Sequence, residues 1–130
     1  MKKFENFCKA LDNLQLVKAV KEPYDVMTMT GSVALFEICF EQSWKAMKEI
    51  LLRHGYSAGQ TTGSPKQIVK LAYSAGMVQD QDGWLKMLDS RNDVVHSYNE
   101  EIAKGIIEDV KRNYINLFDA LKQEIEDKWL

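Results

Sequence analysis

Apolar residues recur at helical spacing from one end of the chain to the other. Spacings of i, i+3, i+4 and i+7 place apolar side chains on one face of a helix. No segment alternates apolar and polar residues for long enough to be a strand. We therefore predict an all-α protein, an antiparallel, up-and-down bundle of four to five helices. The predicted apolar faces begin at Phe4, Val33, Ile68, Trp84 and Ile102.

Breaks in these patterns predict the end of the first helix and both ends of the second. Pro23 ends the first helix, because the residue before a proline is pushed out of helical dihedral angles. Thr28 or Thr30 is expected to cap the second helix, and His54–Gly55 to end it, with the glycine free to adopt positive φ.

The remaining connections are short apart from residues 55–64. That segment holds three glycines, but no strand precedes it and no Gly-Lys-Ser/Thr ending follows, so we interpret it as a linker and not as a phosphate-binding loop. Ser64–Gln67 has the composition of a capping box with proline at the first helical position. Asp80 or Asp82 is expected to start the fourth helix. The last helix is expected to run from about Glu100 to Lys128.

Length and composition are those of one globular domain over residues 1–130. Hydrophobic residues make up 45% of the chain and charged residues 28%, which excludes an intrinsically disordered protein. No apolar run approaches the roughly 18–20 residues that span a bilayer. The first residues are amphipathic and unlike a signal peptide. We therefore expect a cytoplasmic protein that has no association with membranes.

Charge and metal-ligand content narrow the possible ligands. The net charge is −2, and residues 80–130 hold 12 acidic but only 7 basic side chains, so we expect no binding to DNA. An anionic ligand would need a local positive site. Cys8 and Cys39 occupy helical apolar positions and are expected to be small, buried, reduced side chains. Two cysteines and two histidines at scattered positions do not make a zinc site.

The densest cluster of reactive side chains lies in residues 90–98. On a helix, Arg91 and Tyr98 fall on the same apolar face as Trp84 and Leu88. A guanidinium there is costly unless it is paired or lies at an interface. The cluster therefore holds either a structural ion pair or a functional site.

The functional alternative is chemistry on phosphates. A guanidinium binds a phosphate through two parallel hydrogen bonds, and an imidazole can accept or donate a proton near neutral pH. Arg91 and His96 are thus a minimal set for metal-independent cleavage of RNA by its 2′-hydroxyl. They lie about 140° apart on a straight helix, so the helix must bend or end between them, or a second chain must complete the site. If the chain is a nuclease, we therefore expect a homodimer with this cluster of residues at its two-fold axis.

The carboxylates of the second helix have a structural interpretation. Glu37 and Glu41 are spaced like the acids of di-iron bundles, but the facing helices hold no Glu-x-x-His motif. We expect them to be solvated or to lie at an interface, where either can pair with Arg91. The aromatic residues beside them are expected to pack in the core; they are Phe36, Phe40 and Trp44.

The motif Arg-x4-His-x-Tyr, formed by Arg91, His96 and Tyr98, resembles that of the HEPN superfamily (higher eukaryote and prokaryote nucleotide-binding). Phe36–Glu37, Phe40–Glu41 and Trp44–Lys45 add a resemblance to its nucleotidyltransferase substrate-binding branch over nearly the whole chain. The resemblance implies a partner, a minimal nucleotidyltransferase that this chain completes within a heteromeric complex. The chain itself would bind no cofactor, whereas the partner would use ATP and Mg²⁺.

The resemblance also implies roles for individual residues. Some HEPN relatives are ribonuclease toxins that the cognate nucleotidyltransferase silences by attaching AMP to the motif tyrosine. Carried over, Arg91 and His96 would cleave RNA, Asn92 or Asp93 would be a polar helper, and Tyr98 would accept AMP. Three interpretations follow: a partner subunit of a nucleotidyltransferase, a ribonuclease toxin, or a purely structural interaction bundle. Asp93 and the acidic second half favour a protein partner over free RNA.

Overall fold

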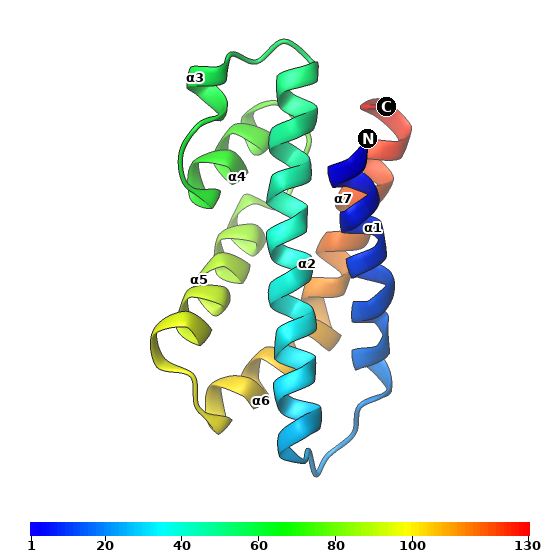
Figure 1. The fold of residues 1–130 in the computed structure, drawn as a ribbon, viewed down its shortest axis with the longest axis vertical. Coiled ribbons are helices and arrows are strands. Elements are labelled where there is room, and N and C mark those ends of the chain that lie inside the picture. Colours follow the sequence, from blue (N-terminus) through cyan, green and yellow to red (C-terminus); the bar gives the residue numbers. More distant parts are fainter.

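The computed structural model describes all 130 residues as an all-helical bundle, which confirms the predicted fold class (Figure 1). The elements are α1 (Lys2–Leu14), the 3₁₀ turn η1 (Gln15–Ala19), α2 (Val26–Arg53), α3 (Ala58–Thr61), α4 (Pro65–Ser74), α5 (Gln81–Ser97), α6 (Glu100–Asp109), the π-helical turn η2 (Val110–Tyr114) and α7 (Ile115–Lys128). No helix combines the length and apolar character needed to cross a membrane.

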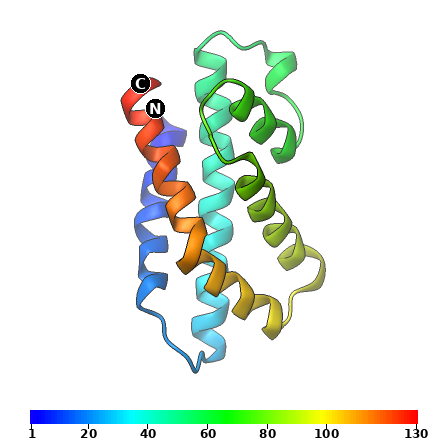
Figure 2. The same ribbon diagram turned by 180° about the vertical axis from the view of Figure 1, so that it is seen from behind.

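The long helix α2 is the axis of the bundle. α1 runs antiparallel along one side of it, and α4 and α5 lie on the other side (Figure 1). Seen from behind, α6, η2 and α7 form one continuous rod that crosses α2 from the end of α5 to the start of α1 (Figure 2). Both termini therefore lie at the same end of the molecule. The front of α2 carries no covering helix along its length.

The start of α2 differs from the prediction. Its cap is Asp25, not Thr28 or Thr30, and the Asp25 carboxylate accepts a hydrogen bond of 2.7 Å from the backbone N–H of Thr28. An aspartate ahead of the first helical residue satisfies a free N–H group as well as a threonine does. The end of α2 is as predicted, with His54 at the cap and Gly55 at φ 94°.

Two other boundaries are confirmed and one segment is corrected. Ser64 and Gln67 form the predicted capping box of α4, and Asp80, the first of the two predicted candidates, caps α5. The predicted linker 55–64 contains a turn of helix, α3, which has its own capping box between Ser57 and Gln60. The prediction missed it because one helical turn is too short to show apolar periodicity.

The predicted last helix, Glu100 to Lys128, is continuous but not uniform. The π-helical turn η2 interrupts it at residues 110–114. A π turn adds one residue to the helical repeat and so rotates the face that the following helix presents. Tyr114 from this turn is fully buried and stacks on Phe36 of α2, with ring centroids 5.4 Å apart.

A single core of 34 buried apolar residues joins all the long helices. Its aromatic centre includes Phe40 and Trp84, as predicted from the helical patterns. Trp44, predicted to be a core residue, is only half-buried and packs against the outside of the core. Cys39 is buried as expected, whereas Cys8 is partly exposed.

The predicted apolar face of α5 is buried only in its first half. Trp84 and Leu88 lie in the core, but Val95 is 61% exposed and Tyr98 46% exposed. The physical reason is the course of α5, which diverges from α2 toward its C-terminal end (Figure 1). Val95 and Tyr98 are therefore only partly covered by other parts of the chain, whereas Val94 still packs against the core.

Candidate functional site

Arg91 lies where α5 begins to separate from α2. Its Nη2 is 3.4 Å from Oε2 of Glu41, and its Nη1 donates to Oδ1 of Asn92 at 3.0 Å. The predicted pairing of Arg91 with a carboxylate of α2 is thus confirmed for Glu41. Both side chains keep about a third of their surface exposed, at 28% and 34%. The guanidinium is oriented by these contacts and still accessible.

A second carboxylate faces the same guanidinium. Partial burial raises the pKa of Glu37, and the nearby charge of Arg91 opposes this shift. Glu41 also lies 3.8 Å from the ammonium of Lys45, one turn further along α2. The charges around Arg91 are therefore mixed, since two carboxylates and the ammonium of Lys45 lie within a few helical turns.

These residues line an open groove of about 390 Å³ between α2 and α5, which we call the Arg91 groove. Its lining combines the charged residues with exposed or half-exposed apolar side chains; the lining residues are Ala34, Glu37, Ile38, Glu41, Arg91 and Val95. Ile38 is 51% exposed and Val95 61% exposed. An open groove lined by both charged and apolar side chains is suited to contact with another macromolecule.

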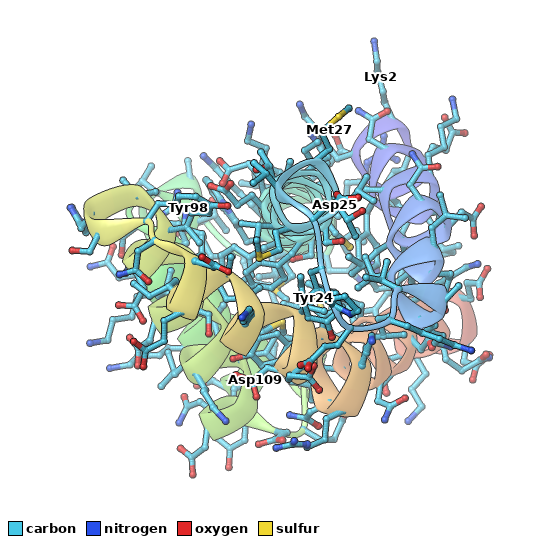
Figure 3. The ribbon with its side chains drawn as sticks, turned by 90° about the horizontal axis from the view of Figure 1, so that it is seen from below. Lys2, Tyr24, Asp25, Met27, Tyr98 and Asp109 are labelled. Atoms are coloured by element: carbon cyan, nitrogen blue, oxygen red, sulfur yellow. The ribbon has the colours of Figure 1, made fainter.

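Tyr98 lies at the C-terminal end of α5, beyond the Arg91 groove. Its hydroxyl is 3.5 Å from the hydroxyl of Thr30, near the start of α2. Asn99 then caps α6, so the chain turns sharply directly after the tyrosine. The contact with Thr30 places Tyr98 at the end of the bundle where α2 begins, and Figure 3 shows it on the side of α2 away from Met27. The phenol is accessible and held by helix ends on both sides.

Tyr98 differs from the buried tyrosines. Tyr24 is only 8% exposed and donates to Glu108 at 2.6 Å, which raises its pKa to about 12. Tyr114 is fully buried. Exposure comparable to that of Tyr98 occurs at Tyr73, which is also 46% exposed but lies on α4, away from the Arg91 groove.

The structure does not bring Arg91 and His96 together within one chain. α5 is a regular helix from Gln81 to Ser97, so it neither bends nor ends between the two residues. His96 is exposed and does not line the Arg91 groove. Asp93, the other predicted helper, is exposed as well. Arg91 and His96 can meet only if the helix bends or ends between them, or if a second chain completes the site. Because α5 is regular, only the second alternative remains.

Sequence patterns missed a positioning contact beneath the site. The hydroxyls of Ser90 and Tyr114 lie 2.7 Å apart, and Tyr114 also donates to the carbonyl oxygen of Lys86 at 3.5 Å. Burial raises the pKa of the Tyr114 phenol, so it remains a neutral hydrogen-bonding group. The contact fixes α5 one residue before Arg91. The only sign of this contact in the sequence is that Tyr114 stands at an apolar position, where phenylalanine would fit the pattern equally well.

The residues present do not form a metal site, since no three His, Cys, Asp or Glu side chains lie together in a suitable cluster. The Arg91 groove offers a guanidinium and two carboxylates, with the phenol of Tyr98 beyond it at the end of α5, whereas the imidazole of His96 lies outside the groove.

Comparison with known proteins places this arrangement in a family. A crystal structure of a protein from Thermus thermophilus superposes with a TM-score of 0.77 at 28% sequence identity, covering 92% of this chain and 98% of that one. None of the curated protein sequences compared with the chain matches it. The family described as "nucleotidyltransferase substrate binding protein like" matches residues 2–127, so the chain belongs to this family.

Proposed function

We propose that this protein is the helical partner subunit of a minimal nucleotidyltransferase in a two-protein, toxin–antitoxin-like system, and that Tyr98 is the residue on which the partner acts. Membership of the family supports the partnership. The observation that carries the role of Tyr98 is its exposed side chain at the C-terminal end of α5, beside the Arg91 groove.

The proposed reaction is transfer of AMP. The phenolic oxygen of Tyr98 attacks the α-phosphorus of ATP held by the partner. The bond from that phosphorus to the oxygen bridging to the β-phosphate breaks, and pyrophosphate leaves. The phenol proton passes to a base of the partner, which also holds Mg²⁺. The contribution of this chain is to hold the nucleophile in place, because positioning supplies much of the rate in such transfers.

A second copy of the chain fits the Arg91 groove. Ile38 and Val95, which line it, are more than half exposed, although large apolar side chains favour burial. A two-fold contact through this face would cover them and pair each groove with the same groove of the other copy. His96 of one copy could approach Arg91 only of the other copy, since the two residues lie on different faces of one helix.

That geometry supports a second candidate function, metal-independent cleavage of RNA by Arg91 and His96. The supporting observation is that Arg91 is accessible in an open groove while His96 is exposed on a different face of α5. Expression of the chain alone tests it: His96→Ala is expected to restore growth and intact RNA. Equal growth and equally intact RNA with and without His96→Ala would remove this function.

The AMP transfer is tested by mixing the protein with the partner nucleotidyltransferase, ATP and Mg²⁺ and weighing the intact chain by mass spectrometry. We expect a gain of one AMP per chain. Tyr98→Phe should abolish the gain, while Tyr73→Phe, which removes an equally exposed phenol on α4, should leave it unchanged. A gain that persists in Tyr98→Phe would reject Tyr98 as the acceptor.

A further inference from the structure

A second groove lies toward the C-terminal end of α2, where the first turn of α1 packs beside it (Figure 1). It measures about 350 Å³, and we call it the Trp44 groove. Most of its surface is apolar; the lining residues are Lys3, Trp44, Lys45, Lys48, Glu49 and Leu52. Trp44 is only half-buried and Leu52 is 42% exposed, so the groove leaves apolar surface uncovered within the chain.

Met27, at the opposite end of α2, is the most exposed large apolar side chain of the protein, at 85%. Figure 3 shows it projecting from the first turn of the helix, away from the core. At about 100° per residue, Met27, Ile38 and the Trp44 groove lie on one face of α2. This is the face that no other helix covers (Figure 1). It therefore carries a projecting apolar side chain at one end and an apolar groove at the other.

The spacing of these features fits two copies that pair through this face. Ile38, which is 51% exposed, lies midway between them: Met27 precedes it by 11 residues, and Glu49 of the Trp44 groove follows it by 11. A two-fold axis beside Ile38 that reverses the direction of α2 would lay Met27 of each copy on the Trp44 groove of the other. At 1.5 Å per residue, both contacts would lie about 16 Å from the axis.

Charge selects this antiparallel arrangement over a parallel one. A parallel pair would lay each Trp44 groove against the same groove of the other copy, and so three lysines against three lysines. The antiparallel pair brings these lysines to the start of α2, where Asp25 is exposed and no basic residue occurs between positions 22 and 44. Lys3 and Lys48 form no ion pair within the chain. Complementary charges fix the orientation of a contact, and like charges oppose it.

We propose that two copies of the chain pair antiparallel across the uncovered face of α2, with Met27 of each in the Trp44 groove of the other. Met27, Ile38 and Leu52 would form the apolar centre of the contact. The lysines of the groove and Asp25 would form its charged rim. The second copy thereby covers the apolar surface that the chain leaves exposed at both ends of α2.

The same arrangement adds a residue of the second copy to the Tyr98 site. The Tyr98 hydroxyl is 3.5 Å from that of Thr30, and the two-fold axis sets Thr30 opposite the part of α2 that contains Trp44 and Lys48. Lys48 of the other copy therefore lies beside Tyr98. An ammonium there would bind the phosphates of ATP during transfer, a role that rests on the function proposed above.

Opposite charges introduced at Met27 test the contact by light scattering over a series of protein concentrations. Met27→Lys should weaken dimerisation at least about tenfold, because it brings an ammonium to three lysines. Met27→Glu should weaken it less, and Lys48→Glu added to Met27→Lys should recover part of the loss. Lys70→Glu, at an exposed residue of α4, should change nothing. A monomeric wild type, or equal weakening by Met27→Lys and Met27→Glu, would overturn the proposal.

Cross-linking with a short bismaleimide, which joins two thiols without an oxidant, tests the orientation. Cys8→Ser removes the partly exposed thiol and leaves the fully buried Cys39. In this background, a mixture of Met27→Cys and Lys48→Cys chains should cross-link. Each variant alone should not, since the two equivalent positions would lie about 30 Å apart. Cross-linking of Lys48→Cys chains with one another would show a parallel pair and overturn the proposal.

A mixture of Tyr98→Cys and Lys48→Cys chains should cross-link as well, and absence of this product would reject the placement of Lys48 beside Tyr98. None of these measurements uses the nucleotidyltransferase. Their failure is therefore distinct from a failure of the AMP transfer, which the mass of the chain reports.

Discussion

Arg91 is held in place by partners that contribute little to stability. Its contacts with Glu41 and Asn92 are partly exposed to solvent, and exposed ion pairs contribute about 0–1 kcal/mol. Their effect is to orient the guanidinium toward α2 within the Arg91 groove. The consequence is a local field in which Glu37 and Glu41 offset the positive charge, so an RNA phosphate gains less there than at an unpaired arginine.

The pH dependence of stability tests the environment of Glu37. Burial raises its pKa above the ordinary value of 4.5, so its contribution to stability is fully present below pH 4.5 and is lost as the pH rises through the folded-state pKa. Glu37→Gln, which is never charged, should therefore be more stable than the wild type at pH 7. Attraction to Arg91 and solvent screening limit this gain to less than about 1 kcal/mol.

Urea unfolding at pH 7 and pH 4 measures this effect. The advantage of Glu37→Gln should disappear at pH 4, and Glu126→Gln serves as the control for loss of an exposed carboxylate on α7. A Glu37→Gln variant less stable than the wild type at pH 7 would show that attraction to Arg91 outweighs burial at this site.

At the scale of elements, the π turn η2 links the back of the bundle to the site. It places the Tyr114 hydroxyl 2.7 Å from that of Ser90, while the ring stacks on Phe36 of α2. Tyr114 therefore contacts both helices that form the Arg91 groove. We infer that this contact keeps α5 in register at the point where it leaves α2.

Tyr114→Phe should lower the free energy of unfolding by about 1–2 kcal/mol, because it keeps the ring packing but removes a buried hydroxyl and leaves Ser90 unpaired. Ser90→Ala should cost a similar amount. The double variant should cost about 1 kcal/mol less than the sum of the two, since both substitutions remove the same contact. Strictly additive losses in urea unfolding would show that the two hydroxyls do not interact.

The elements that could be predicted from the sequence are those with local signals. The capping box at Ser64 and the stop at Gly55 depend on residues only a few positions apart, and both are confirmed. The π turn η2 could not be predicted, because its extra residue is stabilised by packing of Tyr114 against distant helices. The predicted cap of α2 is wrong because two threonines and an aspartate within six residues all satisfy the local rule.

For the whole molecule, the site could be predicted in composition but not in geometry. The sequence places Arg91 and Tyr98 on the apolar face of α5. A guanidinium on such a face needs a partner, so the pairing of Arg91 with a carboxylate of α2 could be predicted. The divergence of α5 from α2 depends on how every helix packs, so the exposure of Val95 could not be predicted from local patterns. That divergence opens the Arg91 groove and leaves the front of α2 uncovered (Figure 1).

The uncovered face of α2 predicts that the protein is a dimer in solution. A charged side chain at the centre of an apolar contact is strongly unfavourable, so Ile38→Glu should convert the dimer into a monomer in size-exclusion chromatography with light scattering. Leu16→Glu, at a 67% exposed apolar residue of η1 away from the Arg91 groove, should leave the dimer intact. Circular dichroism should show the same helix content for both variants, because neither side chain is in the core. A wild-type protein that is monomeric at micromolar concentration, or an Ile38→Glu variant that remains dimeric, would exclude this face as the contact and with it the only geometry that unites Arg91 with His96.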